Sequence, residues 1–182
     1  MIVEPLQIPD VLLITPRKFT DNRGYFIETW ARRRYAEHGI PESFVQDNLS
    51  RSTKGTLRGL HYQIEQPQGK LVRVVEGEVF DVAVDLRRLS PTFGAWVGAS
   101  LSADNARQMW VPEGFAHAFY VISEFATFEY RCTNYYAPEH ERCIRWDDAD
   151  LGIDWPFSKG GEPLLSERDA AAPSLADAET FA

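Results

Sequence analysis

Between residues 44 and 146 the chain consists of short apolar or alternating runs, each followed by residues that favour turns. Successive side chains of a strand point to opposite faces, so runs of this kind predict strands, and many in succession are typical of an all-β sandwich or barrel. Turn residues at Glu76-Gly77 also predict a hairpin. The predicted strands are Val11–Thr15, Tyr25–Thr29, Phe44–Ser50, Thr56–Gln63, Lys70–Glu76, Val79–Leu86, Ala95–Leu101, Gln108–Val111, Ala116–Ile122 and Ala126–Thr133.

Helix is scarce in the sequence. Good helix formers followed by Gly39 predict one short N-terminal helix over Ala31–His38. After residue 146 the pattern becomes irregular, with at most a short helical turn. A chain of 182 residues suits one domain. We expect a single domain over residues 1–182, with its core at about 10–170 and a mobile, Ala-rich tail at 171–182.

Charge and apolar content exclude several classes of protein. A net charge of −8 argues against a general binder of nucleic acid or membrane surfaces, since both need a basic face. No apolar run approaches the roughly 20 residues of a spanning helix, and Met1 to Asp10 does not resemble a signal peptide. We therefore expect a cytoplasmic protein, in which Cys132 and Cys143 are free thiols without an assigned role.

Two histidines lie in the strand region. His61 follows Leu57-Arg58-Gly59-Leu60, and His117 ends a Pro-x-Gly-x-x-His pattern that begins at Pro112. These segments resemble the two halves of the cupin motif pair. Metal-binding cupins carry a second histidine two residues after the first, but here that position is Gln63, whose amide is a poor ligand for a transition metal. We predict no metal; the alternative is that both histidines belong to the core.

Cations are also placed near the predicted strand edges. Arg23, Arg58 and Lys70 could meet a phosphate or diphosphate, although they could equally pair with surface carboxylates. Arg58 and His61 are three residues apart and should point to opposite faces of a regular strand. Gly59 between them could relieve this conflict through a bulge.

Tyrosines add two further possibilities. Tyr130 is by default a core aromatic, and Tyr136 a surface one. A phenol can also donate a proton to a carbanion, and an exposed ring can stack on a nucleobase.

Taken together, these residues resemble the dTDP-4-dehydrorhamnose 3,5-epimerases, over roughly residues 10 to 170. The resemblance implies a cupin-like double-sheet jelly roll. It rests on the motifs Phe19-x-Asp21-x-Arg23-Gly24-x-Phe26-x-Glu28, Gln46-Asp47-Asn48-x-Ser50, Leu57-Arg58-Gly59-Leu60-His61-Tyr62-Gln63, Pro67-Gln68-Gly69-Lys70-Leu71-Val72, Gly77-x-Val79-x-Asp81-Val82-x-Val84-Asp85-x-Arg87, Ser90-Pro91-Thr92-Phe93-Gly94, Pro112-x-Gly114-Phe115-Ala116-His117-x-Phe119 and Thr133-x-Tyr135-Tyr136.

The family resemblance also implies roles. His61 is expected to be the base, Lys70 the cation that stabilises an enolate, Tyr130 the proton donor and Asp169 the partner of His61. No cofactor is implied. The expected substrate-binding residues are Arg23, Glu28, Gln46, Asn48, Arg58, Lys70, His117, Tyr136, Glu141 and Arg168.

Two positions depart from the pattern of many relatives, which carry lysine where this chain has Arg131 and Arg168. Arginine keeps the positive charge of lysine, but its different geometry can shift the position of the bound substrate. Relatives assemble as dimers whose N-terminal segments reach the neighbouring subunit, so Arg23 and Glu28 are expected to serve the other chain.

Four functions remain open at this point. The first is a double epimerase acting on dTDP-4-keto-6-deoxyglucose, and the second a mono-epimerase inverting only carbon 3 or carbon 5. A non-catalytic sugar-binding cupin and a metal-dependent cupin oxygenase are the others. No short motif decides between one inverted carbon and two.

Overall fold

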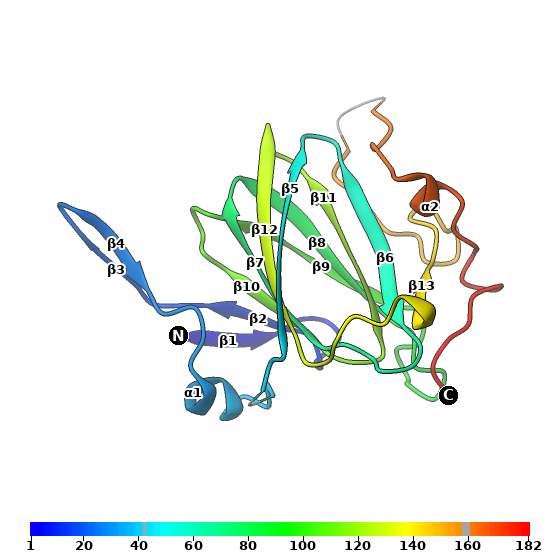
Figure 1. The fold of residues 1–182 in the computed structure, drawn as a ribbon, viewed down its shortest axis with the longest axis horizontal. Coiled ribbons are helices and arrows are strands. Elements are labelled where there is room, and N and C mark those ends of the chain that lie inside the picture. Colours follow the sequence, from blue (N-terminus) through cyan, green and yellow to red (C-terminus); the bar gives the residue numbers. More distant parts are fainter. Residues whose placement is uncertain (42, 158–160) are drawn as a thin grey trace.

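Alternating runs of the chain become two antiparallel sheets that pack face to face in the computed structural model, which describes residues 1–41, 43–157 and 161–182 (Figure 1). The first sheet has the strand order β1 (Ile2–Pro5), β2 (Leu12–Thr15), β10 (Gln108–Val111), β7 (Lys70–Glu76), β12 (Phe125–Cys132) and β5 (Gln46–Thr53). The second has the order β13 (Glu141–Cys143), β6 (Leu57–Gln63), β11 (Phe115–Val121), β8 (Glu78–Asp85) and β9 (Trp96–Ser102).

The main core lies between these sheets. Phe119 of β11 and Phe128 of β12 stack with ring centroids 4.2 Å apart. His117 also stacks on Phe128, at 6.0 Å. Side chains of one parity on each strand therefore face inward, among them Phe119 and Val121 of β11 and Phe128 of β12. The predicted all-β sandwich is confirmed.

The predicted hairpin at Glu76-Gly77 is wrong. β7 pairs with β10 and β12, whereas β8 pairs with β9 and β11, so the chain passes from one sheet to the other at this turn. Gly77 has a φ of +84°, and a Cβ at this position would lie 2.1 Å from the carbonyl oxygen of Phe125. Turn residues predicted the change of direction correctly, but they do not determine which strand becomes the partner.

A two-stranded ribbon of β3 (Lys18–Asp21) and β4 (Gly24–Ile27) projects from the sandwich, followed by the helix α1 (Arg32–Ala36), which is shorter than predicted (Figure 1). The strands β1, β3 and β13 were not predicted from the sequence. All three are only three or four residues long, so they are too short to show a clear alternation.

The C-terminal region covers the outer face of the second sheet. It contains the 3-10 turn Pro138–His140 and the helix α2 (Glu167–Ala170); residues 158–160 of the segment predicted to be irregular lie outside the described residues. The tail expected to be mobile has defined contacts instead. Phe181 forms a bridge with Arg87, its ring lies 5.9 Å from that of Tyr62, and Ala178 is buried. Apolar side chains within the Ala-rich tail explain this packing.

No helix in the described parts of the chain is long and apolar enough to cross a membrane.

Candidate active site

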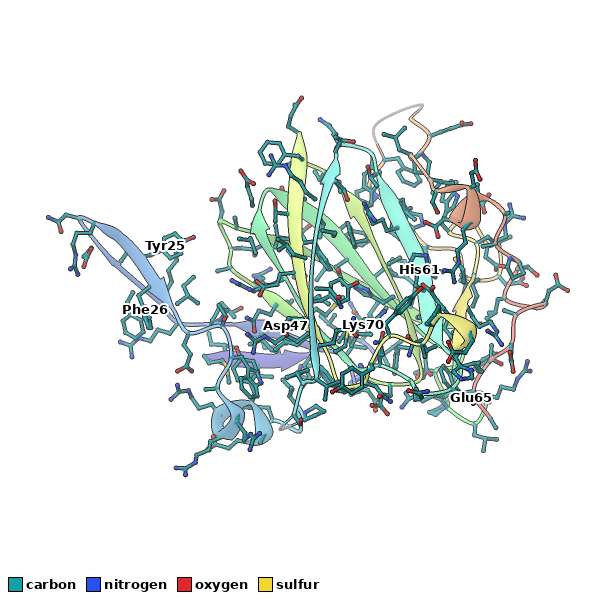
Figure 2. The ribbon with its side chains drawn as sticks, viewed as in Figure 1. Tyr25, Phe26, Asp47, His61, Glu65 and Lys70 are labelled. Atoms are coloured by element: carbon teal, nitrogen blue, oxygen red, sulfur yellow. The ribbon has the colours of Figure 1, made fainter. Side chains whose placement is uncertain are left out.

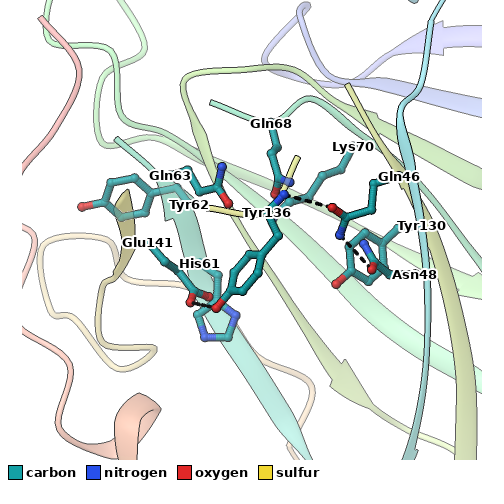
Figure 3. Close-up of a pocket in the computed structure, with 10 residues that line it drawn as sticks. All are labelled: Gln46, Asn48, His61, Tyr62, Gln63, Gln68, Lys70, Tyr130, Tyr136 and Glu141. Carbon is teal, nitrogen blue, oxygen red and sulfur yellow. Dashed lines mark hydrogen bonds between the residues drawn. The ribbon is translucent and has the colours of Figure 1, made fainter. Parts of the chain in front are cut away.

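A cavity of about 350 Å³ has walls from both sheets (Figure 3). β5, β7 and β12 supply one side, and β6 and β13 supply the other. The lining residues are Gln46, Asn48, His61, Tyr62, Gln63, Gln68, Lys70, Tyr130, Tyr136 and Glu141. Most of the residues that the sequence analysis selected from separate motifs therefore lie in or beside one cavity.

His61 is held by a carboxylate from a distant part of the chain. Its Nε2 lies 2.6 Å from Oδ1 of Asp169, which belongs to α2 and is 3% exposed. Ser166 caps this helix by accepting a hydrogen bond from the Asp169 backbone N–H. Nδ1 of His61 has no hydrogen-bond partner among the described residues, so it is the ring nitrogen available to the cavity.

The charge state of Asp169 follows from this arrangement. Burial alone raises the pKa of Asp169, but the hydrogen bond and charge of His61, together with Ser166 and Cys143, outweigh burial and lower the pKa below its usual value. An ionised carboxylate fixes the orientation of an imidazole and stabilises its protonated form. The pair is therefore built to accept a proton at His61.

Gly59 resolves the conflict in side-chain direction between Arg58 and His61. It has a φ of +115°, and the pairing of β11 with β6 shifts register next to it. Arg58 Nε donates to Ser52 Oγ of β5 at 2.9 Å, so this side chain reaches the first sheet from the second. The irregularity expected at Gly59 is present, and it lets Arg58 and His61 serve the same region.

Lys70 lies on β7, opposite Cys132 of β12. Burial lowers the pKa of Lys70, and the acidic groups Glu141 and Asp81 counteract that effect. Asp81 is fully buried on β8 and bonds His117 Nε2 at 2.9 Å. Sequence reasoning assigned no role to Asp81, although a carboxylate in an apolar strand is a signal that could have found it.

Tyr130 projects from β12 into the same cavity and lies across from His61 (Figure 3). Burial raises the pKa of Tyr130, so its phenol stays protonated at neutral pH. A protonated phenol is a proton donor, and its place opposite His61 gives the cavity one candidate base and one candidate acid.

Tyr136 and Glu141 form the outer rim. Tyr136 donates from its hydroxyl to Glu141 Oε2 at 2.7 Å, and Arg168 forms an ion pair with the same oxygen. The backbone N–H of Tyr136 donates to Gln46 Oε1 at 2.9 Å, and Gln46 donates to Asn48 at 3.0 Å (Figure 3). This network holds an exposed aromatic ring over the cavity.

Arg23 and Glu28 are not brought to the cavity of their own chain. Arg23 lies at the tip of the ribbon and pairs with Asp21, while Glu28 pairs with Arg34 of α1. The ribbon projects away from the cavity residues His61 and Lys70 (Figure 2).

Gln63 has its amide committed to the loop beside it. Its Nε2 donates to the carbonyl oxygens of Gln66 at 2.8 Å and Tyr135 at 3.2 Å, and its Oε1 accepts from the Ala137 N–H at 2.9 Å. Gln63 is thus a structural residue and not a free ligand. The described residues contain one group with the spacing of metal ligands, His61, Cys143 and Asp169, whose ligand atoms lie within 4.8 Å of one another.

Comparison with known proteins identifies the family. Residues 5–177 match the family model of dTDP-4-dehydrorhamnose 3,5-epimerase. The dTDP-4-dehydrorhamnose 3,5-epimerase of Pseudomonas aeruginosa is 62% identical over 177 residues, covering 97% of each chain.

This chain belongs to the dTDP-4-dehydrorhamnose 3,5-epimerase family.

Solved structures of epimerases share its fold. A dTDP-6-deoxy-D-glucose-3,5-epimerase from Legionella pneumophila, in complex with dTDP-4-keto-L-rhamnose, superposes with a TM-score of 0.94 at 53% identity, covering 97% of this chain and 94% of that one. A 3'-monoepimerase from Streptomyces bikiniensis, in complex with dTDP-quinovose, has a TM-score of 0.88 at 37% identity, covering 94% and 87%. The family resemblance stated from the motifs is confirmed, as is the cupin-like fold.

Proposed function

We propose that this chain is an isomerase that inverts carbons 3 and 5 of dTDP-4-keto-6-deoxy-D-glucose and gives dTDP-4-keto-L-rhamnose, a step of dTDP-rhamnose and surface polysaccharide biosynthesis. The observation that carries the proposal is the cavity in which the His61–Asp169 pair, Lys70 and Tyr130 meet. Membership of the epimerase family and the high identity to named 3,5-epimerases support the substrate and the double inversion.

The reaction begins with the removal of a proton. The ketone at carbon 4 acidifies the hydrogens on carbons 3 and 5, so one base near both carbons can start either inversion. Nδ1 of His61 takes the proton, and Asp169 stabilises the imidazolium that forms through Nε2. The electron pair of the broken C–H bond moves into the enolate, whose oxygen becomes negative.

Two further residues complete the inversion. The ammonium group of Lys70 stabilises the enolate oxygen, and such preorganised charge is often the largest catalytic contribution. Tyr130 then donates its phenolic proton to the carbon from the face opposite His61. Solvent returns a proton to Tyr130 and removes one from His61, which prepares the site for the second carbon. No step requires a metal, and the commitment of the Gln63 amide to backbone groups favours this reading.

The remaining site residues bind the nucleotide sugar. Gln46, Asn48 and Arg58 are proposed to hold polar groups of the substrate, and Tyr136 to stack on thymine. Glu141 and Arg168 support Tyr136 through the rim network. His117, fixed by Asp81, is proposed to lie near the sugar.

Arg23 and Glu28 are proposed to complete the cavity of a partner subunit in a homodimer with exchanged N-terminal segments. The ribbon that carries Arg23 exposes three aromatic side chains, Phe19, Tyr25 and Phe26, at 49%, 59% and 68%. Exposed aromatic clusters of this kind favour a protein partner. We further propose that residues 1–182 form one epimerase domain and that the protein works in the cytoplasm, where its free thiols Cys132 and Cys143 remain reduced.

A mono-epimerase is the second candidate, because a 3'-monoepimerase shares the fold at 37% identity. One base inverts two carbons only if the sugar can present both to it, which requires either movement of the ring or room beside His61. The non-catalytic alternative does not explain why an ionised carboxylate is paired with the cavity histidine.

The test is turnover of dTDP-4-keto-6-deoxyglucose by the wild type and by His61→Ala. We expect the wild type to form the L-rhamno product and His61→Ala to lose exchange at both carbons while still binding dTDP. His38→Ala removes an exposed histidine at the end of the α1 region and serves as the control with full activity. Turnover retained by His61→Ala would exclude His61 as the base, and no product from the wild type would overturn the proposed substrate.

A further inference from the structure

We propose that Cys143 is a positioning residue for the catalytic pair, holding Asp169 through an S–H···O hydrogen bond. The inference rests on the proposed function, since it assigns Asp169 and His61 to proton transfer. Neither cysteine received a role from the sequence, and the catalytic steps above use neither.

The geometry makes Cys143 the third member of a chain of side chains. β13 pairs with β6 so that Cys143 stands directly opposite His61. Cys143 Sγ lies 3.6 Å from Asp169 Oδ1, the same oxygen that His61 Nε2 approaches to 2.6 Å. Asp169 is thus held from three sides, by the sheet edge, by the imidazole and by the cap of its own helix.

The thiol has a second acceptor, the carbonyl oxygen of Ile144, also at 3.6 Å. That oxygen already accepts a hydrogen bond from the Leu60 backbone N–H at 3.2 Å. A carboxylate is the stronger acceptor, because hydrogen bonds to ionised groups are roughly twice as strong as those between neutral groups. The proton of the Cys143 thiol is therefore directed at Asp169.

The surroundings keep that proton on the sulfur. Cys143 is only 8% exposed, and burial, followed by the charge of Asp169, raises the pKa of its thiol to about 12. A neutral thiol is a hydrogen-bond donor, whereas a nucleophile or a metal ligand would need the thiolate. The close grouping of Cys143, Asp169 and His61 is consequently explained by hydrogen bonding without a metal ion.

The role has a direct consequence for His61. The S–H donor draws part of the negative charge of Asp169 toward itself. Without it, Asp169 is held only by the imidazole and by its own helix cap, so the carboxylate orients the ring of His61 toward the cavity less firmly. Glu141 on β13, Arg168 on α2 and Tyr136 on the rim also face this region, and changes at Cys143 leave all three in place.

Two matched variants test the proposal. Cys143→Ala removes the donor, and Cys143→Ser restores one with nearly the same shape. We expect Cys143→Ala to lower kcat about three- to tenfold with KM within about twofold, as fits the loss of one weak donor to a charged group. Cys143→Ser should keep kcat within about twofold of the wild type. Thermal unfolding of both variants checks that the fold is intact.

A second readout does not depend on turnover. The ring signals of His61 are compared by NMR at one pH in the wild type and both variants, and Cys143→Ala alone should displace them. Equal behaviour of Cys143→Ala and Cys143→Ser, in kcat and in the position of the His61 signals, would overturn the proposal. Displacement of the signals in Cys143→Ala alone, together with a wild type that does not turn over the substrate, would instead contradict the proposed function and leave the positioning role supported.

Discussion

Replacing Lys70 by methionine removes one positive charge from the cavity and keeps most of the length of the side chain. Lys70 is the one lysine or arginine among the described residues that line the cavity. Its charge is partly desolvated, and the carboxyl groups of Glu141 and Asp81 help to retain it. An enolate formed without this lysine has no other cation from the lining residues.

The expected loss of kcat follows from the absence of a second cation among the described lining residues. Removing one preorganised group that stabilises a developing oxyanion typically lowers kcat by roughly 10² to 10³. We therefore expect Lys70→Met to lose about 10² to 10³ in kcat for inversion at either carbon. Its stability should not fall, because burial lowers the pKa of Lys70, so holding the charge in the folded state is unfavourable.

The assay is the rate of solvent deuterium incorporation at carbons 3 and 5, with dTDP affinity and Tm measured in parallel. Lys54→Met is the matched control, since Lys54 is exposed and absent from the cavity lining. A Lys70→Met enzyme that keeps more than about a tenth of the wild-type kcat would refute electrostatic stabilisation by Lys70. A loss of activity accompanied by a collapse of Tm would point to folding and would likewise contradict the argument.

The remaining predictions concern the pair, the acid, the strand irregularity and the basic limb of the pH profile. Asp169→Asn should lower kcat by roughly 10² to 10⁴, because an amide does not stabilise the imidazolium that His61 becomes when it takes the proton; a kcat within about tenfold of the wild type would show that the pair does not support proton transfer. Tyr130→Phe should lose inversion while exchange into the substrate survives, and unchanged epimerisation would remove Tyr130 as the acid. Gly59→Ala should lower the free energy of unfolding by roughly 2–5 kcal/mol, measured in urea, because the φ of +115° disfavours a side chain and the new Cβ would lie 2.5 Å from a carbonyl oxygen of β11; a loss below about 0.5 kcal/mol would contradict that reading. Lys70→Arg should move the basic limb of kcat upward, because burial lowers the pKa of Lys70, whereas an arginine in its place keeps its proton as pH rises; the measurement is kcat against pH, and an unmoved basic limb would contradict this reading.

Much of the sandwich could be predicted because strands with one buried face carry a two-residue period. Lys70–Glu76 and Gln108–Val111 were predicted with the bounds that the structure gives. The local sequence of a strand does not determine which other strands it pairs with. The turn at Gly77 looks like a hairpin in sequence, but the two strands beside it belong to different sheets. Pairing depends on where distant segments pack, which a local pattern does not record.

The structure brings together several candidate site residues that the family motifs supplied from separate parts of the chain. His61, Lys70 and Tyr130 line one cavity, and Asp169 reaches His61 from 108 positions further along the chain. Their chemical roles stay predictions until the variants are measured. Arg23 and Glu28 could also be selected from motifs, but the structure pairs them with Asp21 and Arg34, away from the cavity of their own chain.

Two side chains gained importance only from the structure. Asp81 forms a buried pair with His117 and counteracts the fall in the pKa of Lys70. Cys143 becomes a neighbour of His61 because a three-residue strand pairs with β6. No spacing in the sequence indicates the second contact, since β13 is too short to be recognised as a strand.

The most direct test of the double epimerase is proton NMR of dTDP-4-keto-6-deoxyglucose with the purified, chelator-treated protein in deuterated water, with carbons 3 and 5 observed separately. We predict that deuterium enters at both carbons and that the product has the L-rhamno configuration. Deuterium at only one carbon would identify a mono-epimerase, and none at either carbon would contradict the proposed reaction.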